Sequence, residues 1–121
     1  MTRFDEIMGT EKTVKKMDVL KLILEEGDNV LKCIKEGMDA HKVRKASVKD
    51  INGKLLEGII DVDGTRENVE EVGLVSAKGT FKFGGDELWG TLEVFTEGKK
   101  PLQGKLLRGI AMDNLTIELE F

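Results

Sequence analysis

The sequence contains few of the residues on which most small-protein chemistry depends. It has one cysteine (Cys33), one histidine (His41) and no tyrosine. A single cysteine cannot form an intrachain disulfide, which excludes a secreted disulfide scaffold. One cysteine and one histidine cannot supply the three or four nitrogen and sulfur ligands of a zinc site. We therefore expect no metal and no cofactor, with Cys33 as a small buried side chain and His41 at the surface or capping a helix.

Long hydrophobic runs are also missing. No stretch approaches the roughly 20 apolar residues of a membrane span. Residues 1–16 lack the apolar segment of a signal peptide. We expect a cytoplasmic protein without a membrane partner, in which residues 1–16 form a flexible or edge-lying lead-in and residues 17–121 a single domain. A chain of 121 residues is too short for two independent cores.

Positive charge is in deficit, because the net charge is −4 at pH 7. Lysine and arginine supply most of the non-specific affinity for DNA by neutralising phosphates, so this balance disfavours DNA as a partner. One local cluster departs from the trend, and its members are the candidates for phosphate or partner contacts: Lys42, Arg44, Lys45 and Lys49. The alternative interpretation of this cluster is a solvated edge strand that lysines protect from aggregation.

One helix is predicted, over about residues 28–40, after a short strand within Met17–Leu24 that ends at Gly27. Asp28 and Asn29 carry side chains that can cap the first turn. The apolar residues at helical spacing are Val30, Leu31, Ile34 and Met38.

The sequence pattern changes to a strand period of two from Val43 onward. Val43–Ile51 and Leu55–Val62 are predicted as a hairpin, because the intervening Asn52-Gly53 suits a type I′ turn. Asp63-Gly64 is the next predicted turn, and the polar residues 65–71 are predicted as a loop. The residues expected on one face of the second strand are Leu56, Gly58, Ile60 and Val62.

Further strands are predicted at Val72–Phe83, bending at Gly79, and at Glu87–Thr96, with a turn at residues 84–86 between them. The strand 87–96 carries large apolar groups on both faces, which indicates a core on one side and a partner on the other. Leu102–Leu107 follows. The last strand is expected to bury Leu115, Ile117, Leu119 and Phe121. The predicted fold class is α+β, with one N-terminal helix packed on a mainly antiparallel sheet of hairpins.

Catalytic motifs are not found. Neither Ser47 nor Ser76 lies in a Gly-x-Ser-x-Gly nucleophile elbow. The glycine-rich residues 79–85 lack the lysine and the following helix of a phosphate-binding loop. Residues 61–64, Asp-Val-Asp-Gly, lack the ligand spacing of a calcium loop. These observations favour a protein that is not an enzyme.

Three segments together resemble the PPC domain, the "plants and prokaryotes conserved" family. Residues 19–31 (VLKLILEEGDNVL) resemble its opening strand and helix start, and Leu74–Thr80 (LVSAKGT) is similar to its Ser-Leu-Ser-Gly strand. Gln103–Gly109 (QGKLLRG) resembles its Gly-Gly-His-Leu-x-x-Gly motif. The family's His-x-His is replaced by the stretch Leu88–Thr91, and the motif histidine by Lys105. A metal site built from those histidines is therefore absent.

The resemblance implies a divergent prokaryotic or archaeal-type member with a compact α+β fold that assembles as a homotrimer. Plant relatives carry the domain beside AT-hooks in DNA-binding nuclear proteins, and this chain has no Arg-Gly-Arg-Pro hook. We expect a non-enzymatic, oligomeric binding or regulatory module, with DNA as a partner by resemblance only. The alternative is a small-ligand binder or enzyme whose pocket forms between subunits. The expected interface or pocket residues are Trp89, Phe95, Lys105 and Arg108.

Overall fold

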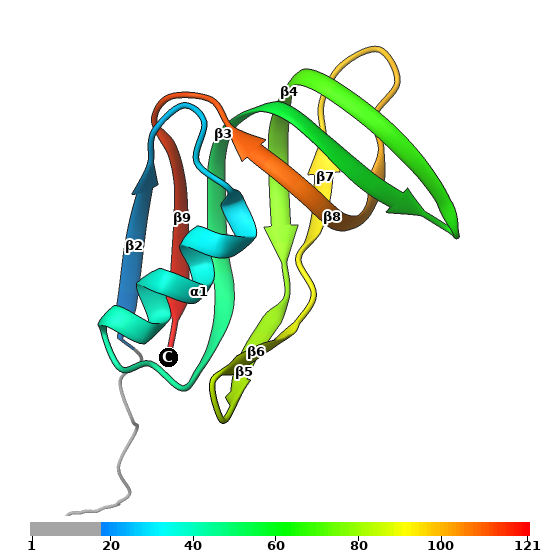
Figure 1. The fold of residues 1–121 in the computed structure, drawn as a ribbon. Coiled ribbons are helices and arrows are strands. Elements are labelled where there is room, and N and C mark those ends of the chain that lie inside the picture. The colour runs from blue at the N-terminus through cyan, green and yellow to red at the C-terminus, as the bar shows by residue number, and fades with distance from the viewer. Residues whose placement is uncertain (1–17) are drawn as a thin grey trace, which may run out of the picture.

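The computed structural model describes residues 18–121, so the predicted lead-in at 1–16 lies outside the described residues. Strands dominate the described part, with one short helix (Figure 1), and the α+β class fits only coarsely. No helix within residues 18–121 is long and apolar enough to cross a membrane. The elements are β2 (Val19–Leu24), α1 (Val30–Ala40), β3 (Lys45–Val62), β4 (Thr65–Lys78), β5 (Thr80–Gly84), β6 (Glu87–Gly90), β7 (Glu93–Thr96), β8 (Gln103–Ala111) and β9 (Leu115–Glu120).

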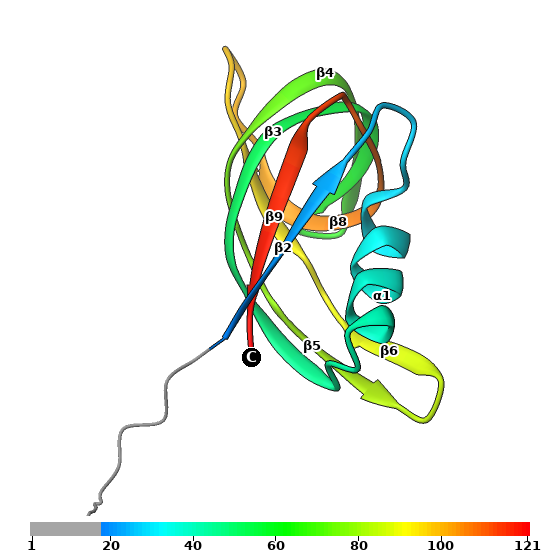
Figure 2. The ribbon, with the colours of Figure 1, turned by 90° about the vertical axis from the view of Figure 1, so that its left-hand side faces the viewer.

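The long strand β3 belongs to two groups of antiparallel strands. Its first half lies between β9 and β5, with β2 beyond β9 and β6 beyond β5. Its second half pairs with β4 and β8, and β7 joins β4 to β8, so these four strands close into a ring. Figure 2 shows α1 on one side of the sheet that contains β2 and β9.

The predicted helix is confirmed as α1. Asn29 is its N-cap and accepts a hydrogen bond from the Lys32 backbone N–H at 3.1 Å. Asp28 instead accepts from the backbone N–H of Glu25 at 2.9 Å, which closes the preceding turn. The capping role predicted for His41 is confirmed, because this residue is the C-cap and its Nδ1 donates to the Gly37 carbonyl at 2.9 Å. The buried helix residues are Val30, Ile34 and Met38.

The hairpin predicted at Asn52-Gly53 is wrong, because β3 runs through both residues. Asn52 pairs with Thr116 of β9, and Gly53 pairs with Leu74 of β4. The dipeptide therefore marks the point at which the strand leaves one group of strands and enters the other. The backbone bends here with a φ of +137° at Gly53, and a Cβ at this position would lie 2.8 Å from the Cα of Leu115.

The turn at Asp63-Gly64 is confirmed, with φ values of 51° and 89° that suit a type I′ hairpin. The loop predicted at residues 65–71 is wrong, because these residues form the first half of β4 and pair with β3. Their polarity reflects exposure of that half of the hairpin. The predicted face of β3 is also shifted: Leu55 is fully buried in place of Leu56, because the register slips by a bulge between Leu55 and Glu57.

The single strand predicted at 87–96 is two strands, β6 and β7. The break follows from the predicted bend at Gly79, which is confirmed as the boundary between β4 and β5. Since β6 pairs with β5 and β7 pairs with β4, the segment between β6 and β7 must change direction beside the bend between β4 and β5. The backbones cross closely there, because a Cβ on Gly79 would collide with the carbonyl oxygen of Thr91.

The buried apolar side chains form one cluster across α1 and both groups of strands. Leu115, Ile117 and Leu119 of β9 are fully buried, as predicted. Phe121 is a correction: it follows β9 and 38% of its surface is exposed. Its backbone is nevertheless tied to the sheet by two 2.9 Å hydrogen bonds with Asp18. The side chains that fill the ring of strands include Leu55, Ile60, Leu74, Leu92, Val94 and Leu106.

Candidate functional site

One residue of the predicted basic cluster contacts other parts of the protein, and the other three are exposed at the surface. The Arg44 guanidinium donates to the carbonyl oxygen of Gly85 at 2.9 Å and lies 5.0 Å from the centre of the Phe83 ring. Arg44 therefore fastens the β5–β6 turn to the start of β3. Lys42, Lys45 and Lys49 are exposed.

Lys45 belongs to a row of exposed side chains that crosses three strands. It is the cross-strand partner of Lys82 on β5, and Lys82 is the partner of Trp89 on β6. We call Lys45, Lys82 and Trp89 the basic row. The row therefore places two positive charges directly opposite each other in the sheet, an unfavourable arrangement that a bound anion would relieve. Lys82 is absent from the predicted cluster because only the pairing of β3 with β5 brings it beside Lys45.

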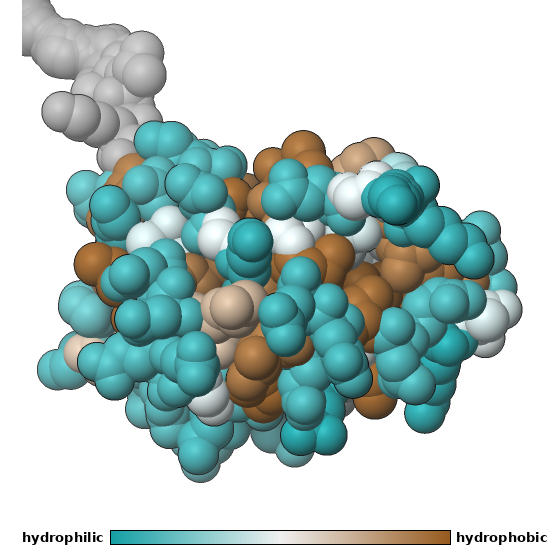
Figure 3. All heavy atoms as spheres, turned by 90° about the horizontal axis from the view of Figure 1, so that it is seen from above, coloured by the Kyte–Doolittle hydropathy of each residue, from teal (hydrophilic) through white to brown (hydrophobic). Residues whose placement is uncertain are grey.

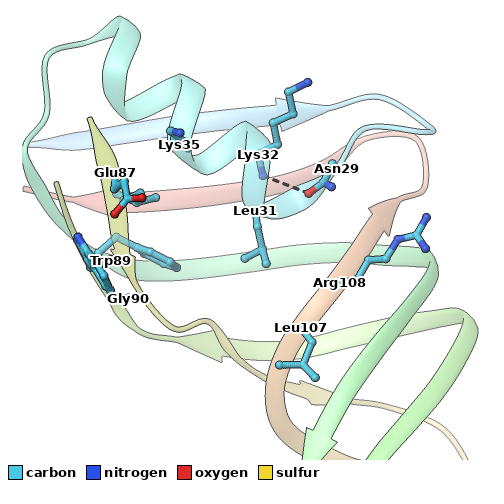
Figure 4. Close-up of a pocket in the computed structure, with 11 residues that line it drawn as sticks. Asn29, Leu31, Lys32, Lys35, Glu87, Trp89, Gly90, Leu107 and Arg108 are labelled. Atoms are coloured by element: carbon cyan, nitrogen blue, oxygen red, sulfur yellow. Dashed lines mark hydrogen bonds between the residues drawn. The ribbon is translucent and has the colours of Figure 1, made fainter. Parts of the chain in front are cut away.

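A cavity of about 620 Å³ lies between α1, the β5–β6 hairpin and β8. We call it the helix cavity (Figure 4). Its apolar lining includes Leu31 from α1, Phe81 from β5 and Leu107 from β8. Figure 4 shows the Leu31 side chain directed from the helix into this space. Trp89, which is 63% exposed, stands at the edge formed by β6.

Charged groups surround the helix cavity unequally. Lys32 and Lys35 come from α1, Arg108 from β8 and Glu87 from β6, so three cations accompany one anion. Arg108 also approaches Glu57, with Nη2 and Oε1 3.4 Å apart and both side chains more than half exposed. The sequence pattern places Lys32 and Lys35 on the polar face of the helix, and only the tertiary structure brings Arg108 opposite them.

The four predicted interface or pocket residues are not brought together. Trp89 and Arg108 border the helix cavity, whereas Phe95 and Lys105 lie on neighbouring strands β7 and β8. Lys105 is opposite Glu93, whose carboxylate is 3.5 Å from the Lys78 ammonium. Together with hydroxyl groups of β3 and β5, these three residues border a second hollow of about 550 Å³.

Two exposed apolar side chains lie on the outer face of the strand ring. Phe95 is 38% exposed, and Val75 is 55% exposed in a bulge of β4 beside the cross-strand partner of Phe95. On the face seen in Figure 3, hydrophobic atoms form narrow bands between hydrophilic ones, without one broad apolar surface.

Cys33 is half-buried on the flank of α1. Partial burial, reinforced by the negative charges of Asp28 and Glu36, raises the pKa of its thiol. Because the thiolate is the metal-binding and nucleophilic form, this environment disfavours both roles. Within residues 18–121 no three side chains of His, Cys, Asp or Glu gather closely enough to hold a metal ion.

Neither a family model nor a curated protein sequence matches the chain. Solved structures do match its fold. A hypothetical protein from Salmonella enterica superposes with a TM-score of 0.76 at 16% identity, covering 89% of this chain and 80% of the other. A "putative DNA-binding protein" from Ralstonia eutropha superposes with a TM-score of 0.71 at 15% identity, covering 83% of this chain and 74% of the other. A plant- and prokaryote-conserved (PPC) protein from Pyrococcus horikoshii superposes with a TM-score of 0.66 at 14% identity, covering 88% of this chain and 77% of the other. At these identities the likeness establishes the fold alone.

Proposed function

We propose that the chain is a divergent PPC-domain protein that acts as a non-enzymatic binding module, assembles with copies of itself and contacts DNA. The support is the fold shared with a PPC protein and with a protein named a "putative DNA-binding protein", together with the three sequence segments that resemble the family. The observation that carries the DNA contact is the basic row.

The basic row matters because the chain as a whole is acidic, with a net charge of −4. Long-range attraction of the whole molecule to DNA is therefore weak, and binding depends on a local surface. Lys45 and Lys82 are adjacent on the surface, so one pair of phosphate groups can relieve their mutual repulsion. Trp89 beside them offers an aromatic surface to the sugar and bases.

The test is fluorescence anisotropy of a labelled DNA duplex, measured over a series of salt concentrations. The native protein should bind with an affinity that falls as salt rises. The double variant Lys45→Gln/Lys82→Gln should bind more weakly, and the slope of log affinity against log salt should decrease by about 2, close to one counterion for each lost phosphate contact.

The matched control is Lys21→Gln/Lys54→Gln, which removes the same charge from exposed positions on β2 and β3 away from the row. It should leave the slope close to that of the native protein. Equal effects of the two double variants would show that only net charge matters, and would contradict the assignment to the basic row. No binding by the native protein at low salt would remove the DNA contact from the proposal.

A further inference from the structure

We propose that the helix cavity binds a small amphipathic anion, a molecule with a flat apolar body and one carboxylate or phosphate group. The anion-binding groups of this site, Lys32, Lys35 and Arg108, do not belong to the basic row, and the two sites share only Trp89.

The floor of the cavity would contact the apolar body of the ligand. Phe81 is 3% exposed and forms part of the core, while Leu31 and Leu88 are half-buried against it. Leu107 is 40% exposed at the β8 side. Contact with an apolar ligand would remove the exposed parts of Leu31, Leu88 and Leu107 from water. A volume of about 620 Å³ lies within the range of sites for small molecules.

The cations on the rim of the cavity would bind the anionic group of the ligand. Lys32 and Lys35 are three residues apart on α1, so their side chains leave the helix on the same face. Within residues 18–121 neither forms an ion pair. The contact of Arg108 with Glu57 is long and exposed, so an anion in the cavity can replace it at little cost.

The apolar floor and the cationic rim together determine the class of ligand. A neutral apolar molecule would add no negative charge beside Lys32, Lys35 and Arg108, and an inorganic anion would leave the exposed apolar side chains of the lining in water. A ligand with both features satisfies both parts of the lining. Since carboxylate and phosphate groups are each recognised by lysine and arginine, the cavity chemistry is shared by the two.

The test compares two dyes of similar ring size in binding to the full chain. Anilinonaphthalene sulfonate is anionic, whereas phenylnaphthylamine is neutral. The anionic dye should bind at least tenfold more tightly. Trp89 is the only tryptophan and stands at the cavity edge, so its emission should be quenched in step with dye binding. Trp89→Phe should abolish this quenching while dye fluorescence still reports binding.

Variants then locate the site. Lys32→Gln/Lys35→Gln should weaken the anionic dye about tenfold and leave the neutral dye unchanged. Arg108→Gln should act in the same direction. The control Lys21→Gln/Lys54→Gln should change neither dye, and thermal melting should show that all variants remain folded. Naphthoate and naphthyl phosphate should each displace the dye, their ratio separating the carboxylate from the phosphate class, while naphthalenemethanol should not.

Equal affinity for the two dyes would overturn the proposal, as would loss of dye binding in the control variant to the same extent as in Lys32→Gln/Lys35→Gln. Absence of dye binding by the native protein would show that the cavity is closed in solution and would overturn it as well. None of these outcomes affects the salt-dependent DNA measurement.

Discussion

The backbone of Gly53 lies directly against Leu115, at the point where β3 passes from one group of strands to the other. A side chain at this position meets two separate obstacles. One is the φ of +137°, which L-amino acids rarely adopt, and the other is the Leu115 Cα at 2.8 Å from the place of a Cβ. The bend of the longest strand therefore depends on one residue.

Gly53→Ala should lower the free energy of unfolding by about 3 kcal/mol, the combined cost of backbone strain and overpacking. Denaturant unfolding followed by circular dichroism measures this change. Gly98→Ala is the matched control, because Gly98 has a φ of +120° but open space around its missing Cβ. The control should lose only the backbone part, about 1 to 2 kcal/mol. Equal losses would mean that the contact with Leu115 adds nothing.

At the scale of the element, α1 is defined by a cap at each end and three buried side chains on one face. The helix positions the rim of the helix cavity, because Leu31, Lys32 and Lys35 all belong to its first two turns. Its start is specified by the Asn29 side chain, which satisfies the Lys32 N–H. Stability of the first turn and geometry of the cavity are therefore linked.

Asn29→Ala should lower the free energy of unfolding by about 1 kcal/mol, since it removes the cap from a helix N–H. Asn29→Asp should retain most of the stability, because its carboxylate can accept the same hydrogen bond. Urea unfolding gives both values, and an unchanged m-value would show that the comparison is between similar folded and unfolded states. A loss below the measurement error for Asn29→Ala would mean that water caps the turn equally well.

At the scale of the molecule, the proposed self-assembly is assigned to two exposed apolar residues on neighbouring strands, Phe95 and Val75. They lie on the outer face of the strand ring, away from the basic row and the helix cavity. An assembly through this face would leave both proposed sites open. That arrangement is compatible with a module that assembles and binds at the same time.

Sedimentation velocity should give a mass of three times the 13.5 kDa chain mass at micromolar concentration. Phe95→Asp should shift the protein to the monomer, because a charge buried in an interface has no partner there. Ile23→Asp is the control, since Ile23 is 65% exposed on β2, at the other end of the molecule (Figure 1). A native monomer would contradict the assembly. Dissociation by Ile23→Asp alone would move the interface to β2.

The predicted elements that are confirmed depend on local patterns. The apolar stripe and capping groups of α1, the Asp63-Gly64 turn and the alternation of β9 are each contained in a short stretch of sequence, and each has a direct physical reading. The sequence also indicates Trp89, Arg108 and Lys45 as candidates for contact with a partner or ligand. It does not say which of these residues meet.

Tertiary pairing decided the rest. Asn52-Gly53 suits a tight turn equally well as a strand bend, and only the packing of β9 against β3 makes it a bend. The polar residues 65–71 become a strand because β3 supplies hydrogen-bond partners along their length. Both proposed sites have the same origin. Lys82 pairs with Lys45 across β5 and β3, and Arg108 borders the same cavity as the helix lysines, because segments far apart in sequence pack together. No local pattern encodes this packing.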